Sequence, residues 1–300
     1  MPGAGRLMYD LARFVDRGRR QMRKWCALLF AVLPALALGQ GAPQPLVFGI
    51  NEGVTYRISA SEVRERFREI ADDLAKLLKR PVHIEYMDEY VQMGKDLAAT
   101  RYDLAYVHPA HYAIRAIDKA HYRLVAVTKG YTEYRASFLM RADAPYTSLA
   151  DPAIHQIGMP DADSITAWMV RATLHDVLGE RAKTLRLRYT RYQDAVPFML
   201  QYGFAEIGAT AASAVIKEYT DKGGKILLKS KPVPIKQLIA SPNLPAQDFG
   251  HIQQYFLSLE LTEEGQRRLA KLGYKGFASF DERELITLGH WLDSGPPDWR

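Results

Sequence analysis

The chain has 300 residues, of which 48% are hydrophobic and 25% are charged, with a net charge of +6; this composition is typical of a folded globular protein. Residues 1–39 hold seven of the basic residues and two of the acidic ones, so the rest of the chain is nearly neutral. The charge therefore gives no support for a nucleic-acid partner.

Residues 1–39 predict a secretory signal peptide. A basic stretch at Met22–Lys24 precedes an apolar run from Trp25 to Leu38, and small residues around Ala37 offer cleavage sites. The run is too short to cross a bilayer comfortably, so we expect cleavage and a periplasmic protein. Met1 and Met22 both remain candidate start sites. The single cysteine, Cys26, lies in this segment, and the mature chain is expected to have neither disulfides nor a thiolate metal site.

Strands and helices alternate in the first half of the mature chain. Apolar runs predict strands at 46–50, 81–86, 102–106 and 122–128, and spacings of three and four residues predict helices at 61–78, 90–99 and 109–120. This order favours a parallel sheet with helices on both faces.

A second set of units follows, and the chain then returns. Strands are predicted at 134–141, 156–159, 185–189, 205–208 and 225–228, with helices at 164–178, 192–202 and 211–222. After two prolines, a strand at 235–240 precedes helices at 246–259, 262–271 and 281–292. We therefore expect an α/β protein with two lobes, one formed by 40–135 and 236–300 and the other by 136–235. The hinge strands would lie near 129–142 and 229–236.

The carboxyl ends of strands are where such sheets bind ligands, in a cleft between the lobes. Three predicted ends carry polar or aromatic side chains. They are the loop Asn51–Arg57 with Tyr56, the segment Tyr106–Tyr112 with His108, and the helix start at Ser164–Ala167.

The helix start after Met159 has two readings. A helix begins with unpaired backbone N–H groups and the positive end of its dipole, so hydroxyls at Ser164 and Thr166 make a cradle for a small oxyanion. Alternatively, Ser164 or Asp163 caps the helix and has no ligand. The sequence leaves both readings open.

Catalytic and metal-binding motifs are scarce. His108 and His111 have a spacing close to that of helical metal ligands, but a metal needs three or four convergent groups. The preferred interpretation is a polar cleft residue at 108 and a solvated helix residue at 111. No nucleophile elbow, zinc-protease motif or phosphate-binding glycine loop is present. We expect no cofactor, no metal and no enzymatic activity.

Other polar residues near strand ends are candidates for ligand contacts. Tyr56, Tyr106 and Tyr112 are able to bury a ring while offering a hydroxyl, although a single tyrosine in such a place more often packs at the rim than contacts a ligand. Glu206 lies in an apolar run, where a carboxylate needs a partner: either a ligand or a neighbouring loop.

The pattern resembles the substrate-binding proteins of phosphate, phosphite and phosphonate ABC transporters, over about 45–290. The segments that carry this resemblance are Leu46–Ile50, Tyr102–Tyr112, Asp161–Ala167, Tyr192–Ala195 and Ala205–Gly208. The resemblance implies the type II periplasmic binding-protein fold, with two hinge crossings and a cleft that closes over a small anionic ligand.

It also implies roles for particular residues. Ser164, Thr166 and Ala167 would hold phosphoryl oxygens, and Tyr106, with Tyr56 or Tyr112, would close over the ligand from the first lobe. We expect His108 to contribute to the same lid. Apart from the resemblance, we expect Gln193 and Glu206 to select the remaining polar groups of the ligand. The chain departs from the family pattern at Ile165, which interrupts the Ser/Thr turn, at Gln193, where a histidine is common, and at His108, where a small residue is frequent.

The predicted function is capture of a small oxyanion for an ABC importer, with a permease of the inner membrane as partner. A ligand-sensing module for a membrane-bound kinase is the alternative from the same class. An enzyme on the same fold is a third alternative, but no nucleophile or metal cluster favours it.

Overall fold

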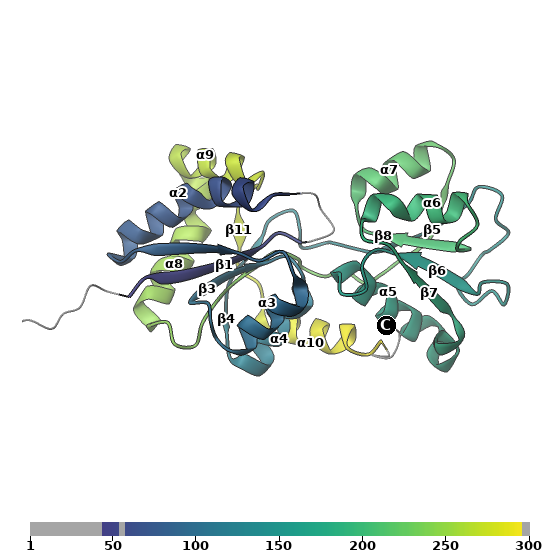
Figure 1. Cartoon of the computed structure of the whole chain (residues 1–300), viewed down its shortest axis with the longest axis horizontal. Helices are drawn as coiled ribbons and strands as arrows, with labels where there is room; N and C mark the ends of the chain where they lie inside the picture. Colours follow the sequence, from purple (N-terminus) through teal and green to yellow (C-terminus); the bar gives the residue numbers. More distant parts are fainter. Residues whose placement is uncertain (1–43, 54–57, 296–300) are drawn as a thin grey trace, which may run out of the picture. The chain divides into compact units, whose positions relative to one another are not determined.

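The computed structural model describes residues 44–53 and 58–295. Its strands form a six-stranded and a five-stranded sheet, and both are mixed rather than purely parallel. Figure 1 shows the elements along the chain. Among the described residues, none of the helices has the length and hydropathy that crossing a membrane would require.

The six-stranded sheet defines what we term the first lobe. Its order is β11-β4-β10-β3-β1-β2, with β1 at Leu46–Asn51, β2 at Val82–Tyr86, β3 at Leu104–Val107, β4 at Arg123–Thr128, β10 at Gln237–Ala240 and β11 at Phe277–Ala278. β1 runs parallel to β2 and β3, whereas β10 lies antiparallel between β3 and β4. The four strands predicted in the first half of the mature chain therefore run in one direction, as expected. No direction was predicted for the re-entering strand β10, which opposes β3 and β4.

Helices cover both faces of this sheet (Figure 1). On one face lie α2 (Ala60–Leu78), α8 (Ala246–Ser258) and α9 (Glu263–Leu272), and on the other α3 (Tyr90–Ala98), α4 (Ala110–Ala120) and α10 (Glu282–Leu292). The apolar positions predicted for the first helix are buried here: Val63, Phe67, Ile70 and Leu74 fill the core beneath α2.

The five-stranded sheet defines the second lobe. Its order is β7-β6-β8-β5-β9, with β5 at Ser137–Met140, β6 at Gln156–Met159, β7 at Arg186–Tyr189, β8 at Ile207–Thr210 and β9 at Lys225–Lys229. β6 is parallel to β7 and β8, and β5 is antiparallel to β8 and β9. The helices are α5 (Ile165–Leu178), α6 (Val196–Gln201) and α7 (Ser213–Asp221).

Several boundaries differ from the sequence prediction. β8 begins at Ile207 rather than at residue 205, and the predicted helix over 192–202 is a 3₁₀ turn at Gln193–Ala195 followed by α6. A further 3₁₀ turn at Gly179–Thr184 and the two-residue strand β11 carry no pattern long enough to predict. The predicted strand over 134–141 is shorter, because Tyr134 forms only an isolated bridge with Val233.

Two segments cross between the sheets, at 129–136 and 230–236, and they are bonded to each other. The amide of Val233 donates to the carbonyl of Tyr134 at 2.9 Å, and the amide of Ile235 donates to that of Tyr131 at 2.9 Å. The two crossings therefore form one short ribbon. α10 adds a further link, since it contacts both α4 of the first lobe and α5 of the second.

Candidate functional site

The start of α5 is capped as one of the two readings of the sequence predicts. Ser164 is the N-cap, and its hydroxyl accepts from the amide of Ala167 at 3.2 Å. The cap therefore engages Ala167, while the first amides of the helix, at Ile165 and Thr166, have no acceptor within the helix by its geometry. Capping and anion binding are compatible here, because the cap uses only one of the exposed donors.

Thr166 is the most informative residue at this helix start. Its side chain is fully buried, and its Oγ1 has no hydrogen-bond partner among the described residues. A buried hydroxyl without a partner carries a desolvation cost of about 1–3 kcal/mol. Such a group is expected where a bound molecule supplies the missing bond.

The loop before α5 is held by a cation from the helix itself. Arg171, one turn and a half into α5, donates from Nη1 to the carbonyl of Ala162 at 2.9 Å. Its guanidinium also lies 4.6 Å from the ring centroid of Trp168. This buried positive charge adds to the helix dipole and favours a negative ligand at the same end.

The start of α4 faces α5. The His111 ring stacks on Trp168 with centroids 5.0 Å apart and an interplanar angle of 25°. His111 is buried. Within the described part of the chain, neither of its ring nitrogens has a hydrogen-bond partner, and the indole Nε1 of Trp168 has none either. The prediction of a solvated residue at 111 is therefore wrong, because contact with the second lobe covers this face of α4.

Both histidines are held neutral. Burial lowers the pKa of His111 well below its usual value, and the neighbouring Arg115, Arg171 and His108 lower it further. Burial and the charge of Lys236 do the same to the pKa of His108. The described residues contain no group of three or more His, Cys, Asp or Glu placed to hold a metal ion.

His108 and Gln193 meet around one tyrosine. The His108 ring packs edge-on against Tyr134 at 6.4 Å, and Gln193 donates from Nε2 to the Tyr134 hydroxyl at 3.0 Å. The Oε1 of Gln193 accepts from the hydroxyl of Thr210 at 2.9 Å and the amide of Ala211 at 2.7 Å. Gln193 thus fixes the end of β8 against the crossing.

Three predicted contact residues lie elsewhere. Tyr106 is fully buried among Phe67, Tyr274 and Phe277, and its hydroxyl pairs with Thr128 at 3.0 Å. It is a core residue rather than a lid, because the side chains of β3 alternate and position 106 points under α2.

Tyr112 and Glu206 also depart from prediction. Tyr112 lies against Tyr90 of α3 and covers Gly94, so it packs the two helices of the first lobe together. Glu206 accepts from the amides of His155 and Gln156, at 3.2 and 2.7 Å. Because Glu206 precedes β8, it lies at the amino ends of β6 and β8, opposite the carboxyl ends where such sheets bind ligands. Of the two partners that the sequence allows for Glu206, the structure shows the neighbouring loop. Tyr56 lies outside the described residues.

Sequence reasoning missed a buried ion pair at the second crossing. The ammonium of Lys236 lies 2.6 Å from Glu52 Oε2 and donates to the Tyr274 hydroxyl at 3.1 Å. Burial lowers the pKa of Lys236 despite Glu52 beside it. A lysine inside the apolar run Val233–Ala240 is the signal that could have revealed this pair, which places two fixed charges beside the crossings.

A search of curated proteins finds no match to this chain, whereas one protein-family model matches it. The model for the family described as "ABC transporter, phosphonate, periplasmic substrate-binding protein" matches residues 53–285. That span is well over half of the chain.

Solved structures share the fold at low sequence identity. XAC2383 from Xanthomonas citri bound to ATP has a TM-score of 0.68 at 15% identity, covering 83% of this chain and 96% of that one. PhnD1 from Prochlorococcus marinus in complex with methylphosphonate has a TM-score of 0.62 at 13% identity, covering 83% and 97%. A binding protein component of a phosphonate ABC transporter from Pseudomonas aeruginosa gives 0.57 at 17% identity, covering 83% and 88%.

These neighbours include proteins of the two-lobed type II periplasmic class, in agreement with the predicted fold class. Together with the two mixed sheets and the paired crossings, the family match settles the assignment that the sequence segments suggested. This chain belongs to the family of periplasmic substrate-binding proteins of phosphonate ABC transporters.

Proposed function

We propose that this chain is exported to the periplasm by a cleaved signal peptide and binds a small phosphonate-like oxyanion at the start of α5 for delivery to an ABC permease. The observation that carries the proposal is the fully buried Thr166 hydroxyl, which has no partner at a helix start. Family membership and the bound methylphosphonate of the Prochlorococcus protein support the same chemistry.

The ligand would be held by donors that the fold already orients. The amides of Ile165 and Thr166, the Thr166 hydroxyl and the proton of the Ser164 hydroxyl would each donate to a phosphonate oxygen. Hydrogen bonds to a charged group contribute roughly 1.5–3 kcal/mol each. Four such bonds, less the costs of desolvation and closure, are enough for micromolar affinity, which corresponds to about 8 kcal/mol.

Access to this helix start requires the lobes to separate. Ser164 and Thr166 are buried in this conformation, and His111 of the first lobe stacks on Trp168 in the first turn of α5. The proposed cycle is therefore a hinge motion about the paired crossings, with closure burying the ligand. No covalent step is needed, so the residues act by binding and exclusion of water.

The test is calorimetric titration with methylphosphonate and with inorganic phosphate. The double variant Ser164→Ala, Thr166→Ala is expected to weaken binding by about ten- to a thousandfold, from the loss of two charge-assisted bonds. Thr173→Ala is the matched control, because Thr173 is also a buried α5 threonine but donates to the carbonyl of Met169. Unchanged affinity in a folded double variant would refute the oxyanion role.

A further inference from the structure

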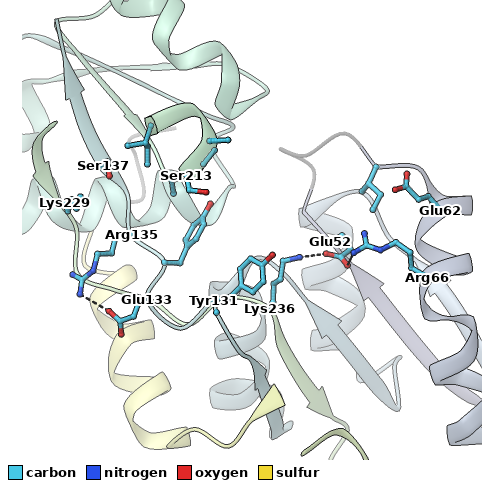
Figure 2. Close-up of a pocket in the computed structure, with 17 residues that line it drawn as sticks. Glu52, Glu62, Arg66, Tyr131, Glu133, Arg135, Ser137, Ser213, Lys229 and Lys236 are labelled. Carbon is cyan, nitrogen blue, oxygen red and sulfur yellow. Dashed lines mark hydrogen bonds and ion pairs between the residues drawn. The ribbon is translucent and has the colours of Figure 1, made fainter. Parts of the chain in front are cut away.

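A pocket of about 650 Å³ opens beside the crossings, and it is rich in charge (Figure 2). Of the 17 residues that line it, four are basic and three are acidic. Two of the acidic side chains are paired within the protein: Glu52 with Lys236 at 2.6 Å, and Glu133 with Arg135 at 3.0 Å. Lys229, by contrast, has no carboxylate within ion-pair distance among the described residues.

The start of α7 opens into this pocket, where Ala212, Ser213 and Ala214 line it. The first hydrogen bond of the helix runs from the amide of Ile216 to the carbonyl of Ala212 at 3.0 Å, so the amides from Ser213 to Val215 precede it. No side chain caps this end, and the first turn has no acidic residue. The exposed amides and the positive end of the helix dipole therefore favour an anion in the pocket.

Ser137 places a buried hydroxyl in the same pocket. It is only 2% exposed, yet it lines the cavity, as labelled in Figure 2. Its hydroxyl forms no hydrogen bond with any other described residue. A buried hydroxyl carries a desolvation cost unless it is hydrogen-bonded, so Ser137 indicates a bound molecule independently of the helix.

The register of the second sheet brings these groups together. Ser137 of β5 lies between Thr210 at the end of β8 and Lys229 at the end of β9. Residues directly opposite each other on neighbouring strands point to the same face, about 5 Å apart. Only Ala211 and Ala212 separate Thr210 from α7. The Ser137 hydroxyl, the Lys229 side chain and the start of α7 therefore lie at one end of the pocket.

The remaining acidic side chain of the pocket lies apart from this group. Figure 2 shows Glu62, on α2, across the pocket from Ser137, Ser213 and Lys229. Glu62 is also exposed, so solvent and salt screen its charge. The helix dipole and Lys229 therefore dominate the electrostatics at the α7 end of the pocket.

We propose that the start of α7 is a second oxyanion site, separate from the one at α5. A phosphate-sized anion would accept hydrogen bonds from the amides of Ser213 and Ala214 and from the Ser137 hydroxyl, and it would pair with the Lys229 ammonium. Because no residue of the α5 start lines this pocket, the two sites are expected to fill independently. The protein would then hold two small oxyanions at once.

Equilibrium dialysis with inorganic phosphate counts the sites. The unaltered protein is expected to bind two equivalents, and the variant Ser164→Ala, Thr166→Ala is expected to bind one. Adding Ser213→Asp to that variant is expected to weaken the remaining site about ten- to a hundredfold, because a carboxylate in the first turn of α7 repels the anion. An acidic residue is favourable at a helix start, so this substitution should leave the fold intact.

Ser213→Asn in the same variant is the matched control, because it has the shape of aspartate without the charge. Its phosphate affinity should remain close to that of the parent variant. Two results would overturn the inference and leave the proposed function intact: one equivalent in the unaltered protein that Ser164→Ala, Thr166→Ala abolishes, or equal affinities in Ser213→Asp and Ser213→Asn. A single equivalent that Ser213→Asp weakens and the α5 substitutions do not would instead support the second site and defeat the proposed function.

Discussion

The buried Thr166 hydroxyl is expected to have opposite effects on the stability of the fold and on the affinity for the ligand. In the unliganded fold this oxygen costs free energy because it has no partner, whereas in the proposed complex it donates to the ligand. Most binding residues stabilise both the unliganded fold and the complex, so the effect of substituting them is difficult to interpret. Thr166 allows the two contributions to be measured independently.

Thr166→Val keeps the shape of the side chain and removes only the hydroxyl. We expect the free energy of unfolding to rise by about 1 kcal/mol, since an unpartnered polar group is eliminated. The affinity for methylphosphonate is expected to fall about ten- to a hundredfold. Urea unfolding and calorimetry on the same sample measure both; a loss of stability together with unchanged affinity would show that Thr166 is an ordinary structural residue.

At the residue scale, some of the site was predictable from the sequence and some was not. The helix start at Ser164–Ala167 was found, because a strand, a polar turn and an apolar helix face are all local patterns. Tyr106 and Tyr112 were placed in the cleft, but their neighbours are α2 and α3. The surroundings of a tyrosine depend on segments that are distant in the sequence, so no local pattern predicts them.

Two glycines show that packing in the first lobe is tight against the sheet and open at the surface of a helix. A Cβ added at Gly49 in β1 would lie 2.6 Å from the ring of Tyr102, whose hydroxyl donates to Asp96 at 2.9 Å. The Tyr102 ring is fully buried and is anchored by this hydrogen bond, so it resists displacement. Gly250 within α8 has nothing within 4 Å of such a Cβ.

Gly49→Ala is therefore expected to destabilise the protein by about 1–3 kcal/mol through overpacking. Gly250→Ala is expected to stabilise it by roughly 0.5–1 kcal/mol, because glycine in a helix interior carries an entropic cost. Denaturant unfolding of the two variants measures the difference. Equal effects from the two substitutions would contradict the packing argument for β1.

The elements themselves were largely predictable, and their connections were not. Most strands and helices fall within two residues of their predicted limits, because period-two and period-3.6 patterns are local. The antiparallel insertion of β10 between β3 and β4 pairs residues more than 100 positions apart. No local pattern in the apolar run Val233–Ala240 states the direction in which it pairs.

At the scale of the whole molecule, neutral histidines lie where the lobes meet. His111 stacks on Trp168 of the second lobe, and His108 packs against Tyr134 of the crossing. The pKa of each is lowered by burial and by nearby cations. The unfolded chain therefore binds protons at a higher pH than the folded protein does, near the ordinary histidine value of about 6.5.

Stability is thus expected to be fully retained above pH 6.5 and to decline as the pH falls below it, by up to about 1.4 kcal/mol per pH unit for each histidine. His111→Phe preserves the stack and should flatten part of this decline. His83→Gln, at an exposed position of β2, is the control and should retain the full slope. Urea unfolding between pH 7.5 and 5.5 measures it; a slope unaffected by His111→Phe would contradict the assignment.

The position of β10 also has a consequence for how the chain is made. Every strand of the second lobe lies between residues 137 and 229, whereas the first lobe needs residues 237–240 as the shared neighbour of β3 and β4. The first 236 residues contain every strand of the five-stranded sheet and lack β10 and β11 of the six-stranded one. The lobe whose strands come first along the chain is therefore the last to receive all of its strands, whereas every strand of the other lobe comes from one continuous segment.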